Sequence, residues 1–145
     1  MKLENQCITI EQAKRLKELG VVQVSLFAWN TGELCYSQTG WNSKPNVHSA
    51  YTVAELGAML PYTLKVPKEF RNEAQYMVLT LGFPQPENMT HYHCSYQLID
   101  MDLDYAGDIY VEYGDTLVEA AANMLITLLT TKIITPEEVN ARLGA

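Results

Sequence analysis

The feature that most constrains the fold is a long apolar segment, residues 116–131, with the sequence TLVEAAANMLITLLTT. It begins with Thr116 and Glu119 at the spacing of a capping box, in which both side chains bond the first backbone N–H groups of a helix. Its polar side chains form only a narrow stripe: Glu119, Asn123, Thr127 and Thr130. Because a helix so widely apolar must be mostly buried, we expect it to lie across one face of a β-sheet.

Three further capping-box spacings predict shorter helices elsewhere in the chain. They are Thr9 with Gln12, Thr52 with Glu55, and Thr135 with Glu138. The first predicted helix covers residues 10–19 and stops at a glycine, the second ends at Pro61, and the last covers residues 136–143.

Short runs of alternating polarity fill the remaining sequence and predict β-strands. QVSLFAWN and ELCYSQ flank Thr31-Gly32 as a hairpin, and YTLKV, YMVLTLGF, HYHCSYQL, IDMDLD and DIYVEY follow along the chain. Short connections between successive strands favour antiparallel pairing. The sequence therefore predicts one α+β domain over residues 1–145, with a mainly antiparallel sheet packed against the long C-terminal helix plus shorter helices.

The stretch IDMDLDYAGD, residues 99–108, carries alternate aspartates at Asp100, Asp102 and Asp104. Apolar residues change from even to odd positions at Leu98-Ile99, which predicts a β-bulge there. The restored register places the aspartates on the same polar face as His91, His93, Ser95 and Gln97. A strand over these aspartates would then continue the preceding one.

A hairpin with the three-residue loop 105–107 and a left-handed Gly107 would follow this strand. It would pair Leu103 with Ile109 and Met101 with Val111. The same register sets like charges opposite each other, which destabilises a strand pair by up to about 1 kcal/mol. We call this predicted acidic face the acidic ladder; its members are Asp100, Asp102, Asp104, Asp108 and Glu112.

Charge is segregated along a chain whose net charge is −7. Residues 72–131 contain nine acidic residues and no Lys or Arg, which argues against direct nucleic-acid binding because phosphate contacts need basic side chains. Charged strands also discourage aggregation, so one or two acids per strand need no further reason. The larger number of acidic residues in this region favours a cationic partner. The partner would be a basic protein, including a neighbouring copy of the chain, or a DNA-binding protein that the acidic surface blocks by imitating nucleic acid.

Two patterns raise the question of a metal site. His91 and His93 have the His-x-His spacing of a ligand pair, but a third ligand is missing nearby, unless His48 or Cys35 approaches from another strand. The aspartates have the first spacings of an EF-hand, but Tyr105 and Val111 occupy the positions that need glycine and glutamate. No metal ligand is assigned, His91 and His93 being the weak candidates, and weak divalent binding by the acidic ladder stays open.

Signals for other classes of protein are missing. The sequence contains no nucleophile elbow or phosphate-binding glycine loop, which disfavours an enzyme and assigns no catalytic residue and no cofactor. Three widely spaced cysteines indicate reduced thiols, and the start of the chain has no secretory pattern. The most apolar stretch, residues 117–134, contains Glu119, Asn123, Lys132 and several threonines, and is therefore too polar to span a bilayer. These features predict a cytoplasmic protein without membrane association.

Four segments carry a resemblance to a known group of proteins: ITIEQAKRLKELGV, SLFAW, YTVAELGAMLP and EAAANMLITLL. Together they resemble a family of small uncharacterised proteins encoded by bacteriophages and mobile elements of gut bacteria. The resemblance implies a shared architecture and a cytosolic accessory protein that acts by binding. It implies no catalytic residues, because the matching segments are those that form the fold.

The sequence thus favours a non-enzymatic binding protein whose acidic ladder meets a cationic partner, with Tyr110 as an aromatic anchor on the same face. The partner would be a protein with a basic surface or a second copy of the chain. The alternative is a metal-dependent or small-ligand-binding protein, including an enzyme, with a pocket assembled from residues distant in sequence.

Overall fold

The computed structural model describes residues 2–71, 74, 76–84, 90–100, 102 and 104–144. Its helices are α1 (Ile10–Glu18), α2 (Val53–Met59), α3 (Leu117–Thr130) and α4 (Pro136–Arg142), with short 3-10 turns η1 (Leu3–Gln6), η2 (Trp41–Ser43) and η3 (Lys68–Phe70). Its strands are β1 (Phe27–Asn30), β2 (Glu33–Tyr36), β3 (Val47–Ser49), β4 (Thr63–Leu64), β5 (Tyr76–Gly82), β6 (Tyr92–Ile99) and β7 (Tyr105–Gly114). The predicted α+β fold is confirmed.

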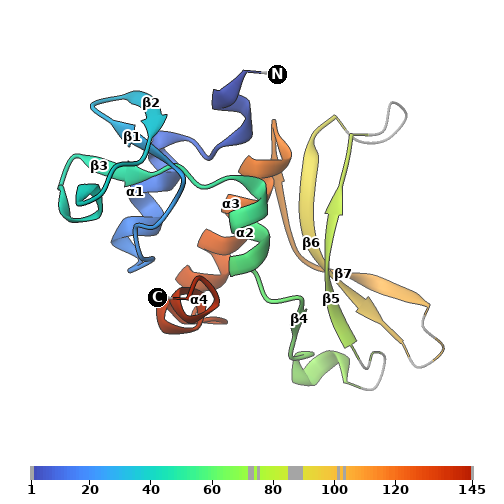
Figure 1. Ribbon diagram of the computed structural model, residues 1–145. Helices are drawn as coiled ribbons and strands as arrows, with labels where there is room; N and C mark the ends of the chain where they lie inside the picture. The colour runs from blue at the N-terminus through green and yellow to red at the C-terminus, as the bar shows by residue number, and fades with distance from the viewer. Residues whose placement is uncertain are drawn as a thin grey trace.

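The strands divide between two antiparallel sheets, a division that the sequence pattern does not reveal. One sheet has three strands in the order β2-β1-β3, and the other has four in the order β4-β5-β6-β7. Helices α2, α3 and α4 lie between the two sheets (Figure 1). Among the described elements, nothing in the view covers the opposite face of the four-stranded sheet, so that sheet has one packed face and one open face.

The four predicted helices form where their capping residues indicate. Three of the capping boxes are complete, at Thr9, Thr52 and Thr135. The fourth is modified: the Thr116 hydroxyl accepts from the backbone N–H of Glu119, while the Glu119 carboxylate accepts from the N–H of Asp115. The predicted hairpin around Thr31-Gly32 is also present, and both turn residues have the positive φ that a tight two-residue turn requires.

Helix α3 lies across the sheet as predicted, and its buried residues make the centre of the core. Leu125 and Leu128 are fully buried together with Tyr96 of β6 and Met77 of β5. Three of the four residues in the narrow polar stripe of α3, Glu119, Asn123 and Thr127, form side-chain hydrogen bonds, and Thr130 is exposed. Asn123 donates to the Tyr113 carbonyl (2.8 Å) and accepts from the Gln12 side chain (2.7 Å), so one side chain joins α3 to β7 and to α1.

Candidate functional site

The three alternate aspartates form a turn, and the prediction that they continue a strand is wrong. Strand β6 ends at Ile99, which pairs with Tyr105, so residues 100–104 connect the two strands. Asp100 holds this turn: its Oδ1 accepts from the backbone N–H groups of Asp102 and Asp104, both at 2.9 Å. An aspartate that bonds the backbone two residues ahead stabilises a turn in competition with a strand.

The predicted pairing of the next hairpin is wrong for the same reason. Ile109 lies opposite Tyr96 and Val111 lies opposite Ser95, because the turn comes earlier than the predicted loop. Their predicted partners, Met101 and Leu103, lie outside the described residues. The predicted register shift between Leu98 and Ile99 is confirmed, although the extra residue belongs to β7.

A second register shift on β7 separates the remaining acids, so the predicted acidic ladder does not form. Ser95 pairs with Val111 and Tyr96 with Ile109, which leaves Tyr110 as an extra residue with a φ of 55°. Residues directly opposite each other share a face, so Asp108 lies on the open face opposite Gln97. The predicted anchor Tyr110 packs against the core instead.

Glu112 lies on the packed face of the sheet, opposite buried Cys94. Its carboxylate accepts a hydrogen bond from the Thr127 hydroxyl of α3 at 2.6 Å. A half-buried carboxylate bound in this way holds β7 against the helix. Glu112 therefore has a structural contact and does not belong to the exposed acidic surface.

The open face of the four-stranded sheet carries three exposed tyrosines. Tyr76, Tyr105 and Tyr113 have exposed fractions of 50%, 60% and 53%. Asp108 lies on the same face and accepts hydrogen bonds from the hydroxyls of Tyr105 (3.1 Å) and Ser95 (3.3 Å). The hydrogen bond to Asp108 raises the pKa of the Tyr105 hydroxyl. We call this surface the tyrosine face; it comprises Tyr76, His93, Gln97, Tyr105, Asp108 and Tyr113, while Ser95, on the same side of the sheet, is buried.

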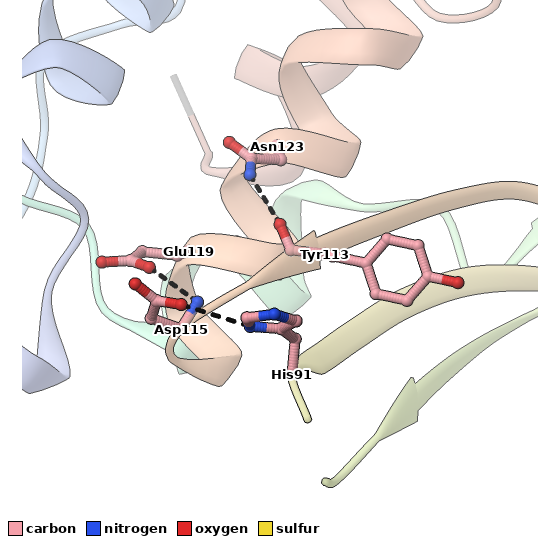
Figure 2. Close-up of polar contacts among 5 residues, drawn as sticks. All are labelled: His91, Tyr113, Asp115, Glu119 and Asn123. Atoms are coloured by element: carbon pink, nitrogen blue, oxygen red, sulfur yellow. Dashed lines mark hydrogen bonds and ion pairs between the residues drawn. The ribbon is translucent and has the colours of Figure 1, made fainter. Parts of the chain in front are cut away.

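The two candidate histidines have different surroundings. His93 lies over Gly82, where an added Cβ would come within 1.7 Å of the imidazole Cε1, and its ring centroid is 6.3 Å from that of Tyr113. His91 lies beyond the start of β6, and its Nδ1 is 3.3 Å from Asp115 Oδ1 (Figure 2). Within the described ranges, no group of three or more His, Cys, Asp or Glu is placed to hold a metal ion.

A groove of about 710 Å³ lies at the end of this sheet that is opposite the aspartate turn. The ends of β5 and β7 and the starts of β6, α2 and α3 form its walls, together with the N-terminal turn η1. We call it the sheet-end groove. Phe83 and Tyr92 line it in an edge-to-face arrangement with their centroids 6.0 Å apart. Its lining comes from five separate stretches of sequence, so no motif could have revealed it.

The sheet-end groove has a carboxylate at its rim. Asp115 lines the groove, bonds His91 and donates its backbone N–H to Glu119 (3.0 Å), as Figure 2 shows. The His91–Asp115 pair is largely exposed, with 56% and 85% of the two side chains accessible. Among the described residues, no hydroxyl or thiol bonds His91, so the pair lacks the nucleophile that a catalytic triad needs.

Two of the three cysteines are protected by burial. Cys7 and Cys94 are 2% and 0% exposed, and burial raises the pKa of their thiols to about 11 and about 12. Because the thiolate is the reactive form, neither is arranged as a nucleophile. Cys35, on β2, is half-buried and donates weakly to the Ala28 carbonyl.

We expect these thiols to make the protein less stable at alkaline pH. The folded-state pKa values lie above the ordinary 9.0, so the folded protein holds these protons more tightly than the unfolded chain. Their stabilising contribution is complete below pH 9 and falls as the pH rises towards 11 to 12. Urea unfolding between pH 8 and pH 11 measures this loss. The loss should be smaller in Cys94→Ala, and an equal loss in that variant would contradict the assignment.

No helix within the part of the chain that the structure describes is long and apolar enough to cross a membrane. Comparisons with protein-family models, curated proteins and solved structures find no match for this chain. The surfaces of the molecule itself are therefore the basis for inferring its function.

Proposed function

We propose that this protein is a non-enzymatic binding protein that receives a basic protein partner on the tyrosine face. The observation that carries the proposal is an open sheet face with three exposed tyrosines, of which Tyr105 bonds the exposed Asp108. Tyrosine is enriched at protein interfaces because it combines a large apolar ring with a hydroxyl that can bond a partner. A broad sheet surface of this kind suits another protein better than a small molecule.

The charge around the tyrosine face favours a basic partner. Asp102 and Asp104 are exposed in the turn that joins β6 to β7, at the margin of this face. Strands β5, β6 and β7 fall within residues 72–131, which contain no Lys or Arg. Lys65 and Arg71 lie beside Tyr76 at the β4 edge of the sheet, so the acidic charge is concentrated towards β6, β7 and the turn between them. Exposed acidic groups attract a basic surface and repel an acidic one, which accelerates association and selects the partner.

A second copy of the chain is a less well supported partner. Among its basic side chains, Lys17 is engaged with the carbonyls of Lys44 and Val47, both at 2.9 Å, and Arg15 pairs with Glu18 at 3.2 Å. The segment that contains Lys65, Lys68 and Arg71 is a further basic region. An origin in a phage or mobile element, which the sequence resemblance implies, stays a prediction and would suit a protein that acts by binding.

Peptide selection tests this proposal even though the partner is unidentified. A random-peptide display library is selected on the immobilised protein, and the peptides that it retains are synthesised. We expect peptides rich in Lys and Arg, with dissociation constants that rise as ionic strength rises. The double substitution Asp102→Lys/Asp104→Lys should weaken their binding by roughly tenfold or more, because it removes two attractive charges and adds two repulsive ones.

The matched control is Glu33→Lys/Glu137→Lys, which changes net charge equally but lies on β2 and α4. Asp100 is left unchanged in both variants because its carboxylate holds the turn. Equal weakening in both double variants would indicate a general charge effect and contradict the assigned surface. Sedimentation of the protein alone would reveal a dimer, and a dimer that dissociates only in Asp102→Lys/Asp104→Lys would make the second copy the partner.

A further inference from the structure

We propose that the sheet-end groove binds an organic cation, an ammonium or guanidinium group attached to an apolar chain or ring. This site lies at the other end of the sheet from the aspartate turn and does not depend on the function proposed for the tyrosine face. Its volume of about 710 Å³ falls within the range of small-ligand sites, about 300–1,000 Å³.

The aromatic lining of the groove provides the first argument. Phe83 is 63% exposed although it lies against Tyr92, so a large apolar ring remains in contact with water at the groove. Val53 and Leu117, at the starts of α2 and α3, extend the apolar surface. A ligand with an apolar body would cover this surface and remove it from water.

The charge of the groove provides the second argument. Among the described residues that line it, Asp115 is the one with a formal charge, and none is Lys or Arg. The Asp115 carboxylate meets the His91 imidazole at 3.3 Å. An aromatic pair beside a carboxylate suits a cation, which the carboxylate attracts by charge and the ring faces attract through their quadrupole.

The start of α3 does not favour an anion in the same place. A helix N-terminus attracts negative charge, but two carboxylates already occupy this one. Glu119 accepts the backbone N–H of Asp115, and Asp115 itself precedes the first turn. An anionic ligand in the groove would therefore meet the like charge of Asp115, with Glu119 behind it, whereas a cation would meet an opposite charge.

Three small molecules with the same apolar body separate these possibilities. 2-Phenylethylamine is cationic, 2-phenylethanol is neutral, and 3-phenylpropanoate is anionic. Titration of each into the intact protein by isothermal calorimetry, with amide shifts in NMR spectra to locate the site, should rank the amine first. A peptide with a single lysine and a matched peptide with norleucine in its place test whether the cation comes from a free amine or from a protein side chain.

Substitutions assign the binding to the groove. Asp115→Asn should raise the dissociation constant of the amine roughly tenfold, because a charged contact is lost, and should leave that of the alcohol unchanged. Phe83→Ala should weaken both ligands, since it removes apolar contact. Asp104→Asn, at the other end of the sheet, should change neither. Asp115 and Phe83 are both exposed, so their variants should fold, and thermal unfolding verifies this.

Equal affinity for the three small molecules would overturn the proposal, as would a preference for the anion. Amine binding that Asp115→Asn leaves unchanged, or shifts confined to residues away from the groove, would also overturn it. No detectable binding of the amine or the lysine peptide at millimolar concentration would have the same consequence.

Discussion

Replacing Gly114 with alanine is expected to lower the free energy of unfolding by about 3 kcal/mol, the upper end of the usual cost of overpacking. A Cβ at this position would lie 2.5 Å from the Ala120 nitrogen and 2.7 Å from the Glu119 Cβ. The first of these is a backbone atom in the first turns of α3, which the Thr116 cap and the packing of the helix hold in place. The strand can approach the helix this closely only with glycine.

Urea unfolding of Gly114→Ala measures the loss directly. Gly57→Ala provides the opposite control, because Gly57 lies inside α2 and an added Cβ meets nothing within 4 Å. There alanine should raise stability by about 0.5–1 kcal/mol through its better helix propensity. If Gly114→Ala were as stable as the parent protein, the close contact between β7 and α3 would be disproved.

Replacing Asn123 with alanine is expected to lower the free energy of unfolding by about 2 kcal/mol, roughly 1 kcal/mol for each hydrogen bond lost. Its amide donates to the Tyr113 carbonyl, and its carbonyl accepts from Gln12. These bonds connect α3 to the edge of one sheet and to the helix that packs beside the other. Their loss should weaken the joint between the two parts of the fold.

A double-mutant cycle with Gln12→Ala isolates the contact between these two side chains. The double variant should lose less stability than the sum of the single variants, by about 0.5 kcal/mol or more. Gln12 also caps α1 by accepting from the Thr9 backbone, so its single substitution carries an additional cost that the cycle removes. Strict additivity would show that Gln12 and Asn123 do not stabilise each other.

The helices could be predicted from the sequence because their signals are local. Thr52 and Glu55 lie three residues apart and bond each other's backbone, so the start of α2 is encoded within one turn. The inward face of β6 could be predicted for a similar reason, since Cys94 and Tyr96 alternate with polar neighbours and are both buried. In these elements one short stretch contains all the information needed.

The prediction for the acidic segment was wrong because alternation alone does not distinguish a strand from a turn. Asp100 bonds the backbone ahead of it, an option that hydrophobic periodicity does not register. The bulge at Tyr110 left no signal either, because a tyrosine with a positive φ is uncommon and no glycine marks the site. One extra residue moved Glu112 from the expected surface to the packed face.

The sheet-end groove could not be predicted, since Phe83, Tyr92 and Asp115 come together only in the folded chain.

The irregular course of β7 has a consequence for solubility. β7 has ten residues and lies at one edge of its sheet, whereas β4, at the other edge, has two. A long regular edge is a template for fibril growth by addition of strands from other molecules. The two register shifts and the positive φ of Tyr110 interrupt the even spacing of backbone donors and acceptors that such growth requires. The edge is thus a poor template for amyloid growth, and we expect the protein to stay in solution at high concentration.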